Sequence, residues 1–170
     1  MKVIFLDIDG VLNSYKFHID NYKDNQMVRE YLATSDLSEI KIRLVDLLLN
    51  IDFNKLYLLK KLADSSGAQI VTTSSWRNMP IYIFVEEFFI KYGLPMLDST
   101  LYLGSRGAEI KQYLETHDVE NYVILDDTIF EDYDDELQEH LVLTSSFIDG
   151  LEEMHIFDAM YMLEGNAKAC

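Results

Sequence analysis

The chain has 170 residues, of which 49% are hydrophobic and 26% charged, and its formal net charge is −16. This length and composition predict a single globular domain over residues 1–170 and exclude a disordered chain. The negative charge argues against a protein that grips nucleic acid through a basic surface, although a bound cation and one or two basic side chains can still hold a nucleotide or a phosphorylated end.

Membrane and secretory signals are absent from the sequence. No apolar run approaches the roughly 20 residues that span a bilayer, and the apolar run that follows Met1 leaves no room for a signal peptide. The single cysteine, Cys170, cannot form an intramolecular disulfide, which fits a reducing compartment. We therefore expect a cytoplasmic protein without a membrane partner, and the oligomeric state stays open.

Apolar runs and helical patterns alternate along the chain. The first strand is predicted at about Lys2–Leu6, and the acidic run Phe130–His140 is interpreted as a solvated loop and helix face. The alternation predicts an α/β fold, a Rossmann-like three-layer sandwich with a central parallel sheet. The remaining strands are predicted at about Ala68–Thr73, Leu94–Leu97, Tyr122–Leu125 and Leu141–Leu143, and helices at Phe53–Ser66, between Pro80 and Gly93, at Gly107–Thr116 and at Leu151–Leu163.

One segment, Asn13–Asp52, departs from this alternation. It leaves the end of the first strand, is rich in aromatic residues up to Ser38, and contains a helical pattern at Glu39–Leu49. It could be a small cap or lid over the site. Equally, Glu39–Leu49 could be one extra packed helix with Ser14–Ser38 as plain loop. No large cap domain is predicted in either case.

Three predicted strands end in polar residues that buried strands do not need. The first ends in DIDGVLN from Asp7, the second in TTSSWR up to Arg77, and a later strand in LDD up to Asp127. The carboxyl ends of parallel strands meet at one edge of the sheet, where ligands bind in such folds. Four carboxylates gathered there need a counter-charge, and a hard divalent cation such as Mg²⁺ supplies it.

These motifs resemble those of the haloacid dehalogenase (HAD) superfamily in its phosphatase form. DIDGVLN is similar to the first motif, the TTSSW stretch to the second at Ser74, and ILDD to the acidic fourth motif. The third motif is a cation at the start of a helix, for which Arg106 in SRGAEI is the best match and Lys111 the alternative. The resemblance covers about residues 1–150 and is closest to small bacterial and phage HAD-like proteins with SSWR and RGxEI motifs.

The resemblance implies a role for each matching residue. Asp7 would attack phosphorus and form an aspartyl-phosphate, and Asp9 would act first as general acid and then as general base. Ser74 would hydrogen-bond the phosphoryl group and Arg106 would neutralise its charge. The metal ligands would come from a set of four aspartates, with Asp9 contributing its carbonyl, and the substrate contacts from a second set. The metal set is Asp7, Asp9, Asp126 and Asp127, and the substrate set is Gly10, Ser75 and Arg77.

The sequence therefore predicts a Mg²⁺-dependent phosphomonoester hydrolase. Its substrate would be a small phosphorylated metabolite, a nucleotide or a nucleic-acid end. The alternative is a non-enzymatic phosphate-binding or interaction domain on the same fold. Two neighbours of the site stay open: Trp76 is either a wall of the site or core packing, and Arg77 either contacts an anionic substrate or forms a surface ion pair.

Overall fold

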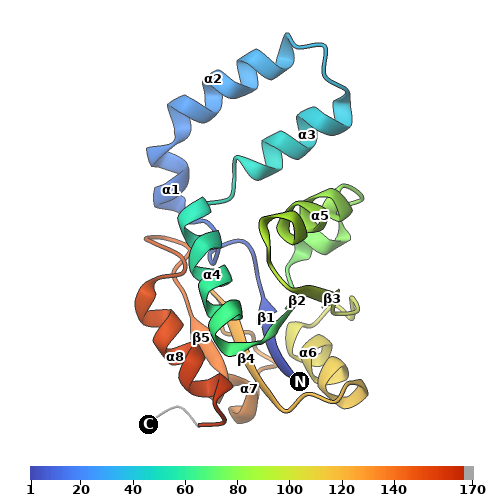
Figure 1. The fold of residues 1–170 in the computed structure, drawn as a ribbon, viewed down its shortest axis with the longest axis vertical. Helices are drawn as coiled ribbons and strands as arrows, with labels where there is room; N and C mark the ends of the chain where they lie inside the picture. Colours follow the sequence, from blue (N-terminus) through green and yellow to red (C-terminus); the bar gives the residue numbers. More distant parts are fainter. Residues whose placement is uncertain (167–170) are drawn as a thin grey trace.

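A computed structural model, which describes residues 1–166, places one five-stranded sheet at the centre of the molecule (Figure 1). All four strand pairings are parallel and the strand order is β3-β2-β1-β4-β5. The first strand of the sequence therefore lies in the middle of the sheet, between the two strands whose ends carry the other motifs. The strands are β1 (Lys2–Leu6), β2 (Gln69–Thr72), β3 (Met96–Ser99), β4 (Asn121–Asp126) and β5 (Leu141–Leu143).

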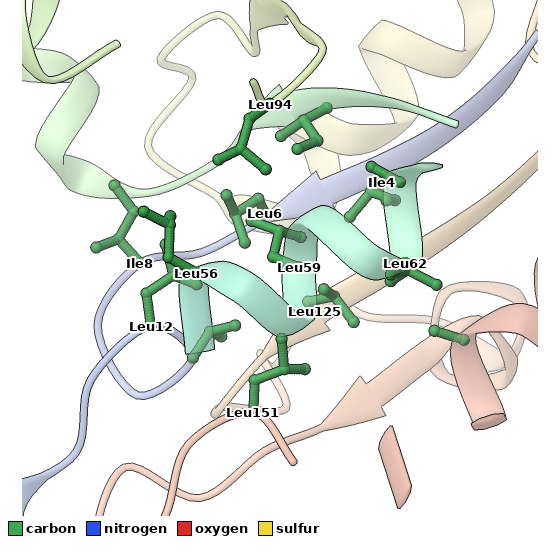
Figure 2. Close-up of a cluster of buried hydrophobic side chains, with 14 of the residues drawn as sticks. Ile4, Leu6, Ile8, Leu12, Leu56, Leu59, Leu62, Leu94, Leu125 and Leu151 are labelled. Atoms are coloured by element: carbon green, nitrogen blue, oxygen red, sulfur yellow. The ribbon is translucent and has the colours of Figure 1, made fainter. Parts of the chain in front are cut away.

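Three helices cover one face of the sheet: α4 (Phe53–Ser66), α5 (Tyr82–Tyr92) and α8 (Glu153–Leu163). Helix α4 begins where the Asp52 carboxylate accepts a hydrogen bond from the Asn54 amide at 2.8 Å, and it ends at Gly67, which adopts a left-handed conformation. Its apolar side chains recur every three or four residues and are buried. Figure 2 shows the leucines of α4 beside the apolar side chains of the central strands: Leu56, Leu59 and Leu62 against Ile4, Leu6 and Leu125.

The opposite face is covered by α6 (Arg106–Thr116) and α7 (Asp135–Glu139). Phe5 of β1 packs edge-on against Tyr113 of α6, with ring centroids 5.6 Å apart. Side chains of one strand alternate between the two faces, so Val3 and Phe5 belong to this second cluster while Ile4 and Leu6 belong to the first. The predicted three-layer α/β sandwich is confirmed.

The segment after β1 forms three helices, which Figure 1 shows extending beyond the sheet. They are α1 (Tyr15–Asp20), α2 (Tyr22–Ala33) and α3 (Glu39–Leu48). The helix expected at Glu39–Leu49 is confirmed, whereas the alternative that Ser14–Ser38 is plain loop is wrong. Helix α2 has only one buried residue, Leu32, so it lacks the apolar stripe by which a helix is recognised in sequence.

The other predicted elements lie within a few residues of their observed bounds. Two short elements were not predicted: the 3₁₀-helix η1 (Ser75–Asn78) and α7, which lies inside the acidic run and buries Leu137. No helix in residues 1–166 is long and apolar enough to cross a membrane. Cys170, on which the expectation of a reducing compartment rests, lies outside the described residues.

Candidate active site

Three carboxylates converge at the carboxyl edge of the sheet. Asp7 follows β1, Asp126 is the last residue of β4, and Asp127 comes next in the chain. One oxygen from each of the three lies within 4.8 Å of the others. The sheet enforces this meeting because the Asp7 amide donates to the Leu125 carbonyl at 2.9 Å, which continues the pairing of β1 with β4. Hard oxygen ligands at this spacing suit a divalent cation such as Mg²⁺.

Burial makes this cluster electrostatically unfavourable without a counter-ion. Desolvation raises the pKa of Asp7, against the lowering effect of the nearby Arg106 guanidinium. Desolvation, and then the charge of Asp7, raise the pKa of Asp126 to about 7. A bound cation would stabilise the ionised forms of Asp7 and Asp126, whose pKa values burial raises.

Arg106 is the cation that the structure places beside these acids. Its Nη1 donates to Asp126 Oδ2 at 2.8 Å and to Thr73 Oγ1 at 3.0 Å, and it lies 3.6 Å from Asp7 Oδ1. The alternative third-motif cation, Lys111, instead pairs with Asp134 at 2.6 Å on the surface. The start of α6 thus directs Arg106 into the site, while Lys111, five residues later, points away from it.

Asp9 stands apart from the three-carboxylate cluster and is exposed. Both of its carboxylate oxygens accept hydrogen bonds: Trp76 Nε1 donates to Oδ2 at 2.8 Å, and Asn13 Nδ2 donates to Oδ1 at 3.0 Å. Trp76 is also buried in the core, so it packs and at the same time holds Asp9. Asn13 further accepts a hydrogen bond from the Gly10 amide at 2.9 Å, which closes the turn after β1.

Gly10 is buried and lies against the carboxyl group of Asp127, one of the three clustered acids. Its φ is +77°, and a Cβ at this position would lie 2.4 Å from the Asp127 carboxyl group. Its carbonyl accepts from Thr144 Oγ1 at 2.7 Å, and the Thr144 amide donates to the Asp126 carbonyl at 2.9 Å. The end of β5 therefore fixes the motif-one turn to the end of β4.

The end of β2 contributes hydroxyl groups and a buried ion pair. Ser74 is fully buried, and its hydroxyl hydrogen-bonds the Asp7 carboxyl group, which lowers the pKa of Asp7. Ser75 is exposed beside it. Arg77 pairs with Glu109 of α6 at 2.5 Å, with both side chains buried, and it also donates to the carbonyls of Thr73, Ser74 and Thr100. The expected alternative of an ion pair is therefore observed for Arg77, but the pair is buried and does not lie on the surface.

The structure thus brings most of the predicted site residues to one edge. Asp7, Asp126 and Asp127 form one carboxylate cluster, Arg106 lies beside Asp7 and Asp126, and Ser74 interacts with Asp7. The roles of Ser75, Arg77 and Gly10 toward a substrate stay predictions. Sequence reasoning missed the hydrogen bonds that hold Asp9. The sequence predicts Trp76 as either a site wall or core packing, and Trp76 has both positions, whereas Asn13, the last residue of DIDGVLN, has no predicted role.

Comparison with known proteins gives one match. The family described as "HAD domain in Swiss Army Knife RNA repair proteins" matches residues 3–156, which cover every residue of the site. Neither the search of curated proteins nor the search of solved structures found a match.

Proposed function

Since this chain belongs to the family of HAD domains in Swiss Army Knife RNA repair proteins, we propose that it is a Mg²⁺-dependent phosphomonoesterase that acts on a phosphorylated RNA end. The family supports a phosphoester hydrolase in an RNA repair setting. The observation that carries the proposal is the cluster of Asp7, Asp126 and Asp127, whose oxygens lie within 4.8 Å of one another beside Arg106.

Asp7 is the nucleophile in this proposal. One carboxylate oxygen forms a bond to phosphorus while the bond to the leaving oxygen breaks, which gives an aspartyl-phosphate. Arg106, 3.6 Å from Asp7, and the Ser74 hydroxyl lie where they can stabilise the charge on the phosphoryl oxygens. A Mg²⁺ held by Asp7, Asp126 and Asp127 would neutralise the phosphoryl group's negative charge when bound.

Asp9 transfers the protons. In the first step it gives a proton to the leaving oxygen. In the second step it takes a proton from the attacking water, whose oxygen bonds to phosphorus while the bond between Asp7 and phosphorus breaks, so phosphate is released and both aspartates return to their starting states. Its exposure lets it reach both the leaving group and water. The hydrogen bonds from Trp76 and Asn13 set the orientation of its carboxylate.

The test is hydrolysis by the purified protein of RNA oligonucleotides that carry a 3′- or a 5′-phosphate, with an aryl phosphate as a generic substrate. We expect activity that requires Mg²⁺, disappears with chelator and returns when Mg²⁺ is restored. Asp7→Asn should abolish both turnover and formation of the phosphoenzyme. Activity that survives exhaustive metal removal would contradict the proposal.

The alternative of a non-enzymatic phosphate-binding domain gives a different result in the same experiment. It predicts Mg²⁺-assisted binding of the phosphorylated oligonucleotide with no release of phosphate from any substrate. Phosphate release that Asp7→Asn abolishes excludes this alternative.

A further inference from the structure

A pocket of about 450 Å³ opens next to the candidate active site. Three loops line it, and each follows the carboxyl end of a different strand: Ser75–Asn78 after β2, Tyr102–Ser105 after β3, and Phe130–Asp132 after β4. Its volume falls within the range of small-molecule sites. None of the residues that line it belongs to the α1–α3 segment.

Arg106 is a shared wall between this pocket and the phosphate site. Its Nη1 contacts Asp126 and lies 3.6 Å from Asp7, while its guanidinium carbon lies 5.0 Å from the centre of the Phe130 ring. Arg106 therefore borders both the position of a phosphate at Asp7 and the pocket. The group that carries the phosphate is within reach of the pocket.

The pocket offers aromatic surface and a free amide. Tyr102 is 71% exposed, and within residues 1–166 its side chain has neither a hydrogen bond nor a ring contact. Asn78 is exposed as well, and its amide bonds no other described residue. Phe130 presents a half-buried ring. These groups suit a flat aromatic ligand with polar edges.

The charges around the pocket disfavour a second phosphate inside it. Glu131 and Asp132 line the pocket, and the positive charge of Arg77 is already matched by Glu109. A polyanionic strand would meet carboxylates here instead of the Lys and Arg residues that usually follow a phosphate backbone. The pocket therefore fits an uncharged aromatic group better than further backbone.

The loop that carries Tyr102 is fixed at both ends. The Thr100 amide donates to the Thr72 carbonyl at 3.0 Å, and the Leu103 amide donates to Glu109 Oε1 at 3.1 Å. Arg77, the buried partner of Glu109, donates from Nε to the Thr100 carbonyl at 3.0 Å. A ring held on such a loop loses little conformational entropy when a ligand stacks on it.

We propose that this pocket binds the nucleoside that carries the scissile phosphate, with its base stacked against Tyr102 and its polar edge toward Asn78. This proposal rests on the proposed function, which it extends from a phosphate ester to a nucleotide. Arg77 and Glu109 act as positioning residues, because their ion pair holds the Tyr102 loop in place.

The test compares substrates with and without a base. The kcat/KM of adenosine 3′- and 5′-monophosphate is divided by that of ribose 5-phosphate, for wild type, Tyr102→Ala, Tyr102→Phe and the control Tyr57→Ala. Tyr57 is a 60% exposed tyrosine on α4, outside the pocket. We expect Tyr102→Ala to lower the ratio for at least one isomer by roughly 5- to 100-fold, the range for loss of one base-stacking contact. The ratio should be close to wild type in the other two variants.

A wild-type ratio near one, or a ratio that Tyr102→Ala leaves unchanged, would overturn the nucleoside subsite. Failure of the proposed function looks different, because then no phosphate is released from any ester. In that case, calorimetric titration of the chelator-treated protein with the two adenosine monophosphates decides the point. Binding that Tyr102→Ala weakens and Tyr57→Ala does not would uphold the subsite without hydrolysis, and the absence of such binding would overturn it.

Discussion

Asp7 and Asp9 stand two residues apart, yet their surroundings differ. The side chain between them, Ile8, is fully buried in the core, so both acids face the site. Asp7 is buried beside Arg106 and the β4 acids, whereas Asp9 is exposed and accepts hydrogen bonds from Trp76 and Asn13. A buried charge suits a nucleophile that works with a metal, and an exposed carboxyl group suits a proton carrier.

Replacing Asp9 should slow the reaction in proportion to the need for a proton on the leaving group. In Asp9→Asn, we expect kcat on an alkyl ester such as a phosphorylated RNA end to fall by roughly 100-fold or more. The fall on an aryl phosphate should be much smaller, because an aryl oxygen leaves without a full proton. Steady-state kinetics on both substrates measures the difference.

The control for this prediction is Asp158→Asn, which removes an exposed carboxylate of α8 far along the chain from the motifs. It should leave both rates near wild type. An equal loss on aryl and alkyl esters in Asp9→Asn would show that Asp9 does not act as the general acid.

At the scale of elements, α1–α3 differ from the rest of the molecule in how little they bury. Helices α1 and α3 have no buried residue. The segment is tied down at its start, where Ser14 Oγ donates to the Ile148 carbonyl at 2.9 Å and the Tyr15 ring stacks on Phe147 at 5.3 Å. It leaves the sheet directly after the motif-one turn. A segment with this position and this exposed surface is a candidate for contact with the more distant part of a substrate.

Alanine variants of two exposed aromatic residues and of the half-buried Phe17 test that idea. We expect Tyr15→Ala, Phe17→Ala and Tyr22→Ala each to raise KM for a phosphorylated RNA oligonucleotide by roughly fivefold, the effect of losing a contact worth about 1 kcal/mol. The kinetics on adenosine monophosphate should change little, because a mononucleotide makes no remote contacts. Tyr22 is 61% exposed, so its loss should not destabilise the fold, whereas Tyr15→Ala also removes the stacking on Phe147, so stability is measured for each variant.

Thermal unfolding accompanies these kinetics, with Tyr161→Ala on α8 as a matched surface variant. Equal losses on the oligonucleotide and the mononucleotide, together with a lower unfolding temperature, would show instead that the segment is ordinary core.

For the whole molecule, the distribution of negative charge should make the free energy of unfolding depend on pH and on bound Mg²⁺. The net charge is −16, and part of this excess lies on buried acids of the site, Asp7 and Asp126. Because desolvation raises the pKa of Asp126 to about 7, the folded protein binds this proton more tightly than the unfolded chain does. The contribution of this group to the free energy of unfolding is therefore largest at low pH and declines as the pH rises toward 7.

The metal-free protein should show this decline, and Mg²⁺ should remove it. Between about pH 5 and about pH 8, Asp126 should lower the free energy of unfolding of the chelator-treated wild type by about 2 to 3 kcal/mol relative to Asp126→Asn. Carboxylates that do not interact with Asp126 titrate in both proteins and cancel in the comparison, whereas the charge of Asp7 acts on Asp126, so the difference reports on this pair. Denaturant unfolding at several pH values measures this difference in the free energy of unfolding between the two proteins. Saturating Mg²⁺ should stabilise the wild type more at about pH 8 than at about pH 5. Parallel pH profiles for the two metal-free proteins would contradict the assigned pKa.

The sequence by itself determined the parallel α/β sheet, the strand ends that carry chemistry and the order of the motifs, because buried strands and amphipathic helices leave local apolar patterns. Only the tertiary structure separated Arg106 from Lys111, since the two side chains, five residues apart, leave α6 in different directions and only Arg106 meets Asp7 and Asp126. Likewise, only the tertiary structure showed that Trp76 and Asn13 donate hydrogen bonds to Asp9, and that a pocket lies between the Tyr102 and Phe130 loops. The hydrogen bond between Asn13 and Asp9 lies within the turn after β1, and the other contacts join residues from different strand ends. Their distances depend on strand order and on the path of each loop. A local sequence pattern specifies neither the strand order nor the path of a loop.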